Sequence, residues 1–106
     1  MKFAVVALVL TTALVVGAAP PKKKAASHEV TMGAMKFTPA TVNVHPGETI
    51  TWTNKDIVPH TVLAPPDIMS PLIQPGETFS WKAEKPGTKN YMCSLHAMMK
   101  GTIIVK

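Results

Sequence analysis

Proline–glycine turns recur along this chain and divide it into short segments. Turns at Pro46-Gly47, Pro75-Gly76 and Pro86-Gly87 are each followed by residues whose polar and apolar side chains alternate. Alternation with a period of two, bounded by proline and glycine, is typical of half-buried β-strands. The chain also contains 10 prolines, which argue against long helices. We therefore predict an all-β domain, a Greek-key β-sandwich or barrel of about seven to eight strands.

The predicted strands can be placed by the same alternation. In residues 49–53, for example, Ile50 and Trp52 are expected to face the core, and Phe79 and Trp81 share one face of a later segment. The stretch 64–72 contains three prolines and is predicted to be an irregular connection. The predicted strands are residues 41–44, 49–53, 61–63, 78–81, 88–93 and 102–105.

The N-terminal residues resemble a targeting segment. Lys2 precedes the apolar run of residues 3–16, which only Thr11 and Thr12 interrupt, and small residues follow at 17–19. This order is typical of a secretory signal peptide, so we predict that residues 1–19 are removed on export to the periplasm. A retained membrane anchor is the alternative, although the run is short against the roughly 20 apolar residues of a typical span.

A basic, proline-led linker is predicted for residues 20–27, followed by one domain at 28–106. Lys2 and the linker's Lys22, Lys23 and Lys24 account for most of the net charge of +5, because from His28 onward seven lysines face six acidic residues. The domain itself is therefore nearly neutral, and the chain has no arginine. Nucleic-acid binding would need basic residues clustered on the domain. We expect no nucleic-acid partner.

Cys93 is the only cysteine, so the domain cannot contain an internal disulfide. A domain of this size has a thin hydrophobic core and often depends on disulfides or a metal. A free thiol in an oxidising compartment is exposed to oxidation unless something occupies it. Metal ligation would occupy it.

Other soft donors lie close to Cys93 in the sequence. His96, Met98 and Met99 follow on the predicted loop into the last strand, and His60 lies 33 residues upstream of Cys93. Two imidazoles and a thiolate form the trigonal plane of electron-transfer copper sites, and a thioether makes the weak axial contact. The residues therefore predict one type 1 copper ion.

Each donor also has an ordinary explanation. A lone cysteine is often a buried apolar residue, and methionines often fill core gaps. A Cys/His pair can be a nucleophile and its base, but this segment shows neither a helix N-terminus nor a third group that would hold the base. Zinc prefers four strong donors, and a thioether is a poor fourth donor for it. The whole set favours copper.

Residues 37–106 resemble the cupredoxins, or blue copper proteins, of the plastocyanin and amicyanin type. The short Cys-x-x-His-x-x-Met spacing is closer to amicyanin than to plastocyanin. The matching motifs are Phe-Thr-Pro at 37–39, Val-Asn-Val at 42–44, Pro-Gly-Glu-Thr-Ile-Thr-Trp-Thr-Asn at 46–54, Pro-His-Thr-Val at 59–62, Tyr-Met-Cys-Ser-Leu-His at 91–96 and Met-Lys-Gly at 99–101.

The resemblance implies that copper is held by His60, Cys93, His96 and Met99. Met98 competes for the axial position, but its spacing from His96 is one residue short of the amicyanin pattern. The resemblance also implies second-shell roles. Asn54 matches an asparagine that bridges to the segment after the cysteine, Thr61 stands where relatives often have asparagine, and Leu95 and Ala97 stand where amicyanins have proline.

The expected function is that of an exported one-electron carrier, not an enzyme, with no small-molecule substrate. We expect a monomer whose redox partner, such as a dehydrogenase, cytochrome or oxidase, docks near His96. One alternative is a periplasmic copper-binding, delivery or tolerance protein that uses additional methionines as soft donors, namely Met32, Met35, Met69 and Met98. Another is a cupredoxin-fold subunit that only docks to a larger oxidase.

Overall fold

The computed structural model describes residues 26–106. The predicted signal peptide and most of the predicted linker fall in residues 1–25, outside the described residues, and these assignments stay predictions. The first strand begins at Ser27. No helix in the described part of the chain is long and apolar enough to cross a membrane.

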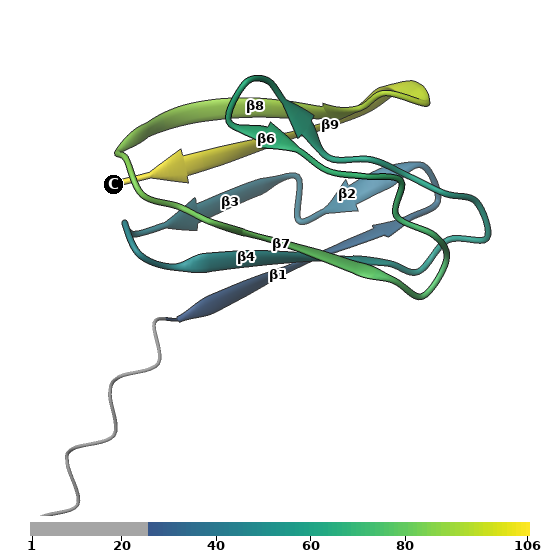
Figure 1. Ribbon diagram of the computed structural model, residues 1–106, viewed down its shortest axis with the longest axis horizontal. Coiled ribbons are helices and arrows are strands. Elements are labelled where there is room, and N and C mark those ends of the chain that lie inside the picture. The colour runs from purple at the N-terminus through teal and green to yellow at the C-terminus, as the bar shows by residue number, and fades with distance from the viewer. Residues whose placement is uncertain (1–25) are drawn as a thin grey trace, which may run out of the picture.

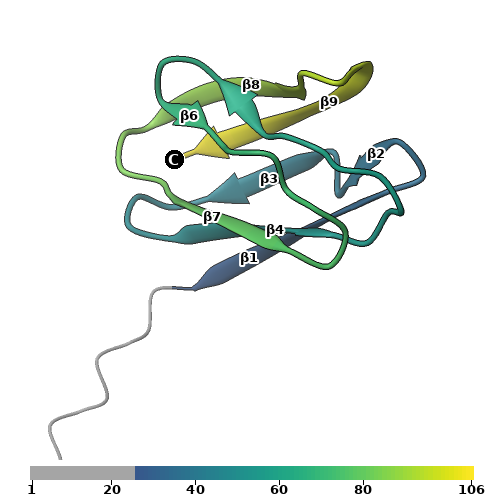
Figure 2. The ribbon, with the colours of Figure 1, turned by 45° about the vertical axis from the view of Figure 1, so that its right-hand side comes forward.

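The described residues form two stacked β-sheets and no helix (Figure 1). One sheet has the strand order β2-β1-β4-β7 and the other the order β3-β9-β8-β5-β6, and the two layers remain separate in a turned view (Figure 2). The strands in residues 26–106 are β1 (Ser27–Gly33), β2 (Lys36–Thr38), β3 (Thr41–Val44), β4 (Thr49–Asn54), β5 (Leu63–Ala64), β6 (Ile68–Met69), β7 (Thr78–Lys82), β8 (Gly87–Cys93) and β9 (His96–Val105).

Both sheets mix parallel and antiparallel pairs. β1 runs parallel to β4 and β3 runs parallel to β9, whereas β4 with β7 and β8 with β9 are antiparallel. Figure 1 places the β1–β2 turn, the segment after β4 and the β8–β9 turn at one end of the sandwich, opposite the C-terminus. Residues far apart in the sequence therefore meet at this end.

Alternating side chains build the core between the sheets. In β4, Ile50, Trp52 and Asn54 are buried while the residues between them are partly exposed. The rings of Trp52 and Phe37 each meet Tyr91 edge to face, with centroid separations of 5.4 Å and 4.6 Å. This burial raises the pKa of Tyr91 to about 12. The core is thus centred on an aromatic cluster that joins both sheets.

The all-β sandwich is confirmed, with local differences from the predicted strands. β1 and β2 were not predicted, and the stretch 64–72 is not wholly irregular, because it contains β6. The last strand was expected to begin at residue 102, but β9 begins at His96, directly after a two-residue turn. Pairing of Cys93 with His96 extends the β8–β9 ladder into the predicted loop. With the two-residue strands β5 and β6, the described residues hold nine strands.

The β1–β2 turn has an unusual backbone. Its two residues, Ala34 and Met35, have φ angles of 51° and 62°. Two-residue hairpin turns of this kind favour asparagine and glycine, because positive φ brings Cβ close to the following carbonyl oxygen. Holding alanine and methionine there costs on the order of 1 kcal/mol per residue. The turn is therefore a strained site.

Glu48 joins the start of β1 to the turn between β3 and β4. Its Oε1 accepts a hydrogen bond of 2.6 Å from the His45 N–H and lies 3.0 Å from Nε2 of His28. The hydrogen bond from His45, followed by that from His28, lowers the pKa of Glu48 below its usual 4.5. His28 and His45 thus have structural contacts at the strand ends.

Glu48 should make the fold sensitive to acid. Its pKa is lower in the folded chain than in the unfolded chain, so its stabilisation is present above pH 4.5 and is lost as the pH falls through the lowered value. In the parent protein, the urea concentration at the midpoint of unfolding should fall as the pH is lowered. We expect Glu48→Gln to reduce this fall. The control variant Glu84→Gln, which changes an exposed carboxyl group, should show the same fall as the parent protein. An acid profile that Glu48→Gln leaves unchanged would contradict this role.

Candidate metal centre

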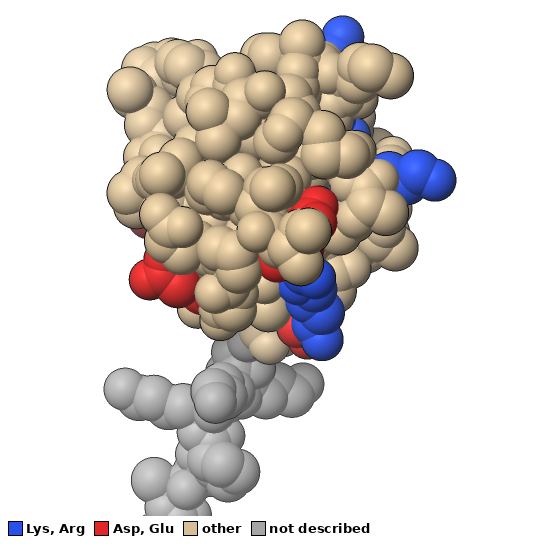
Figure 3. Space-filling model, turned by 90° about the vertical axis from the view of Figure 1, so that its right-hand side faces the viewer, with Lys and Arg blue, Asp and Glu red and all other residues tan. Residues whose placement is uncertain are grey.

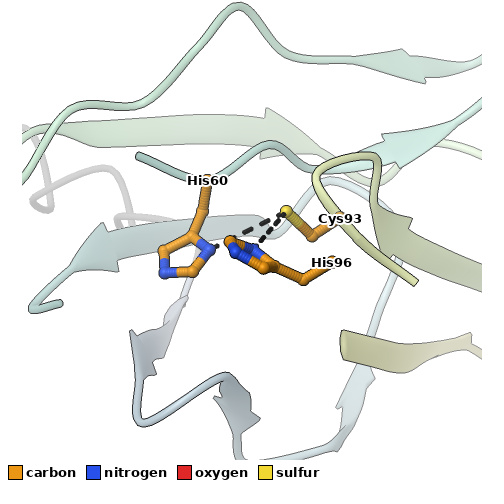
Figure 4. Close-up of side chains that lie close together, drawn as sticks. All are labelled: His60, Cys93 and His96. Carbon is orange, nitrogen blue, oxygen red and sulfur yellow. Dashed lines mark hydrogen bonds between the residues drawn. The ribbon is translucent and has the colours of Figure 1, made fainter. Parts of the chain in front are cut away.

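Three of the predicted ligands converge at the end of the sandwich described above. His60 lies on the segment between β4 and β5, Cys93 ends β8, and His96 begins β9. The Cys93 Sγ lies 3.8 Å from Nδ1 of His60 and 3.8 Å from Nδ1 of His96. All three donor atoms lie within 4.8 Å of one another. In Figure 4 the two imidazoles and the thiol point toward one another.

These separations suit a single metal ion. Imidazole and thiolate donors bind a first-row ion at about 2.0 Å and 2.3 Å, and two such bonds at the 120° of a trigonal plane would place their donors about 3.7 Å apart. The observed sulfur–nitrogen distances of 3.8 Å agree with this value. The spacing of the donor atoms therefore fits a single ion in a trigonal plane.

Hydrogen bonds hold His60 on both sides. Its backbone exchanges N–H···O bonds of 3.0 Å and 2.8 Å with Ile73. Its Nε2 lies 3.0 Å from Oδ2 of Asp56. An ionised carboxylate only accepts, so Nε2 carries the donated proton and Nδ1 keeps its lone pair for a metal. Asp56 was not predicted, although a carboxylate four residues before a candidate ligand could have indicated it.

The local environment favours the thiolate of Cys93. Burial, the largest single influence, raises the pKa of this thiol. Hydrogen bonds from the Thr61 and Leu95 N–H groups, together with the imidazoles of His60 and His96 beside the sulfur, outweigh burial and lower the pKa to about 6. A thiol binds a metal as the thiolate, so Cys93 is ready to act as a ligand near neutral pH.

Thr61 connects the two ligand segments. Its N–H donates to the Cys93 Sγ at 3.4 Å, and its hydroxyl oxygen accepts a bond of 2.8 Å from the Ser94 N–H. The prediction that Asn54 bridges to the segment after the cysteine is wrong. The Asn54 side chain instead donates to the carbonyls of Val58 and Ile73, because its buried amide lies under the His60 segment.

Burial separates the two adjacent methionines. The Met99 side chain is 1% exposed, in the core of the sandwich, whereas Met98 is 93% exposed. Met99 also lines the same cavity as His96. The assignment of Met99 as the axial donor stays a prediction, and its burial beside His96 distinguishes it from the exposed Met98.

Comparison with known proteins places the chain in a family. Residues 24–106 match the model of copper binding proteins of the plastocyanin/azurin family. The chain is 35% identical to amicyanin-alpha of Methylorubrum extorquens, over 91% of this chain and 87% of that protein. It is 36% identical to the plastocyanin of Scenedesmus fuscus, over 70% of this chain and 90% of that protein. A solved structure of the Cu(I) form of an amicyanin mutant aligns with a TM-score of 0.71 at 26% identity, covering 76% of this chain and 82% of that one.

The chain therefore belongs to the plastocyanin/azurin family of copper-binding proteins. Its fold is that of the cupredoxins, and His60, Cys93 and His96 are grouped so that they could hold a metal ion, as in blue copper proteins.

Leu95 should raise the reduction potential through its amide. A hydrogen bond to the thiolate withdraws charge from sulfur and favours Cu(I), and the Leu95 N–H is one of the groups that lower the Cys93 pKa. Leu95→Pro removes this donor. We expect voltammetry to show a potential about 40 mV lower, which corresponds to a hydrogen bond of about 1 kcal/mol in a one-electron couple.

Leu95→Ala is the matched control, because the Leu95 side chain is exposed and alanine keeps the amide. Its potential should stay close to that of the parent protein. A rise in potential with proline would contradict the hydrogen-bond argument.

Proposed function

We propose that this protein is an exported one-electron carrier whose copper ion is held by His60, Cys93, His96 and Met99. The observation that carries the proposal is the trigonal set of two imidazoles and one thiol at 3.8 Å sulfur–nitrogen distances. Bound copper would supply a Cu(II)/Cu(I) couple. The protein acts as a carrier rather than an enzyme, and it needs no small-molecule substrate.

The residues of the site suit rapid electron transfer because they are held in place. His60 is fixed by Ile73 and Asp56, and Cys93 is fixed by the β8–β9 ladder and by Thr61. A donor set that keeps its arrangement in both oxidation states needs little reorganisation when an electron moves. Fixed ligands thus favour exchange of electrons over exchange of the ion.

The partner surface in this proposal surrounds His96. This histidine is partly exposed, unlike His60, and it lines a cavity of about 490 Å³ whose other lining residues are mostly apolar. A small apolar surface suits the brief encounters of electron-transfer proteins. The proposed partner is a redox protein such as a dehydrogenase, cytochrome or oxidase, and the carrier itself acts as a monomer without nucleic acid.

Export to the periplasm is part of the same proposal. It is supported by the charged and apolar pattern of residues 1–19. A single cysteine is compatible with an oxidising compartment if a metal occupies it. Mass spectrometry of the mature protein would show whether the leader is removed or retained as an anchor.

Copper delivery remains the second candidate function, because Met35, Met69 and Met98 are exposed soft donors. Met32, which was proposed for the same role, is fully buried in the core and cannot contact a partner. A carrier should exchange electrons quickly and retain Cu(I), whereas a delivery protein should surrender Cu(I) to an acceptor.

Two measurements on the copper-loaded protein separate these functions. Electron self-exchange can be measured by NMR line broadening, and copper loss can be measured with a Cu(I) chelator under reducing conditions. We expect self-exchange to be much faster than copper loss. Rapid surrender of Cu(I) with slow self-exchange would replace the carrier proposal with delivery.

Met99 should tune the potential as the axial donor. Cu(II) requires more electron donation than Cu(I), so replacing the thioether by an apolar group destabilises the oxidised form more. We expect Met99→Leu to alter the visible and EPR spectra and to raise the potential by about 60 mV, a tenfold change in a one-electron equilibrium. Met98→Leu, at the exposed neighbour, should leave the spectra unchanged. The reverse result would assign the axial position to Met98.

A further inference from the structure

Soft donors line the cavity beside the β8–β9 turn. It has a volume of about 490 Å³, and neither a carboxylate nor a hydroxyl side chain lines it. Thioethers and imidazole are the ligands that Cu(I) accepts, whereas hard cations require oxygen. The lining residues are Ala34, Met35, Lys36, His96, Ala97, Met98 and Met99.

The solvent exposure of the sulfur and nitrogen donors decreases from the surface toward the proposed copper site. Met98 is almost wholly exposed, Met35 is 45% exposed, His96 is partly buried and Met99 is buried. His96 and Met99 belong to the copper site proposed above. Met35 and Met98 are outside that set, yet they line the same cavity. The cavity therefore joins two unassigned thioethers at the surface to two proposed ligands inside.

The backbone that presents Met35 is strained. Met35 and Ala34 occupy the left-handed region at a turn where glycine or asparagine would be relaxed. The side chain is largely outside the core, so core packing does not explain why methionine stands there. The Met35 N–H bonds to the Asp56 carboxylate, which accounts for the position of the backbone but not for a thioether side chain at that position.

The charge around the cavity favours a monovalent ion. Lys36 is the one charged residue in its lining. This positive charge repels a divalent cation twice as strongly as Cu(I). The Asp56 carboxylate, which is bonded to the Met35 N–H and to His60, lies outside the lining, so the preference for Cu(I) rests mainly on the thioether donors. Figure 3 faces this end of the sandwich and shows a surface that is mostly uncharged, with acidic side chains visible near its middle as well as at its margin.

We propose that Met35, Met98 and His96 form an entry site for Cu(I), through which the buried centre is loaded. The inference rests on the proposed copper site and adds a route of metallation to it. Cu(I) arrives on a donor of soft sulfur or nitrogen ligands, and bonds to the two thioethers and the imidazole form as the donor's bonds break. Transfer inward would then form the bond to the Cys93 thiolate as the bonds to the two entry thioethers break, and a proton that is still on the sulfur would pass to solvent. The steps are ligand exchanges, and no electron is transferred.

The test compares copper uptake by the full-length apo-protein and by the double variant Met35→Leu/Met98→Leu. Leucine keeps the apolar surface and removes both sulfurs. Cu(I) is presented as its complex with a bathocuproine-type chelator, and uptake is followed in stopped flow by loss of the chelator's colour. We expect uptake by the double variant to be about tenfold slower, with the spectrum of the loaded, oxidised protein unchanged.

Two controls make the result specific. The variant Met69→Leu/Met92→Leu removes two exposed thioethers that do not line the cavity, and it should load Cu(I) at the parent rate. Loading with Cu(II), which has less preference for thioethers, should be equally fast in all three proteins. A cavity double variant that takes up Cu(I) within twofold of the parent rate would overturn the entry site.

Failure of the entry site is distinguishable from failure of the proposed function. If the parent protein turns blue on oxidation and both double variants load at the same rate, the copper centre stands and the entry site is rejected. If the parent protein stays colourless with copper bound, the proposed electron carrier is rejected, and the entry site is rejected with it.

Discussion

Cys93→Ser is expected to abolish the intense blue absorption of the copper-loaded protein completely. That absorption arises from charge transfer between a thiolate and Cu(II), and Cys93 is the only cysteine in the chain. A serine hydroxyl is a hard donor that stays protonated near neutral pH, so it cannot supply the same bond. The loss should be seen in visible and EPR spectra recorded with one equivalent of copper.

His45→Ala is the matched control for this experiment. His45 is an imidazole outside the proposed site, with its Nδ1 3.0 Å from the carbonyl oxygen of Lys106. The His45 variant should keep the blue absorption, which would show that loss of a single histidine away from the site has no effect. Blue colour that persists in the serine variant would rule out Cys93 as the ligand.

Among alanine substitutions at the glycines of the described strands, Gly101→Ala should produce the largest loss of stability. Gly101 pairs with Tyr91 across the β8–β9 ladder, and the Tyr91 phenol ring covers it. A Cβ at position 101 would lie 2.5 Å from Cε1 of Tyr91 and closer still to Cζ. The ring is packed against Phe37 and Trp52, so it cannot easily move aside. We expect the free energy of unfolding to fall by about 3 kcal/mol, as for a severe case of overpacking.

Gly33→Ala provides the comparison. Gly33 is also in a strand, but no atom lies within 4 Å of the position that its Cβ would take. Urea unfolding of the metal-free variants should therefore show a change below about 0.5 kcal/mol for Gly33→Ala. Equal stability of the two alanine variants would mean that Tyr91 has more freedom than its contacts indicate.

The sequence predicted strands best where alternation was sustained within one segment. Ile50 and Trp52 in β4 are buried as expected, because each faces the opposite sheet. β1 was missed although Val30 and Met32 alternate with polar residues, since it follows a basic stretch and pairs with a strand about twenty residues away in the sequence. β2 has three residues, too few for a period to be recognised.

The candidate metal donors could also be predicted from the sequence, but the hydrogen bonds that hold them in place could not. His60, Cys93 and His96 meet as predicted. The prediction was possible because two imidazoles and one thiol match the donor set that copper prefers. The bonds of Thr61 to Cys93 and Ser94, and of Asp56 to His60, depend on which segments lie side by side. Such long-range geometry leaves no periodic signal. The hairpin at Ser94-Leu95 also lacks the glycine or asparagine that usually indicates one.

The division of the donors between two anchors has an evolutionary consequence. His60 is tied to Ile73, while Cys93, His96 and Met99 all belong to one hairpin whose ends are set by the β8–β9 ladder. The sequence of this hairpin can therefore change without a change in the rest of the fold. Insertions or substitutions between Cys93 and Met99 could alter colour and redox behaviour while the scaffold around His60 stays the same. Among related proteins, sequence differences should therefore be more frequent in the hairpin between β8 and β9 than in the two sheets.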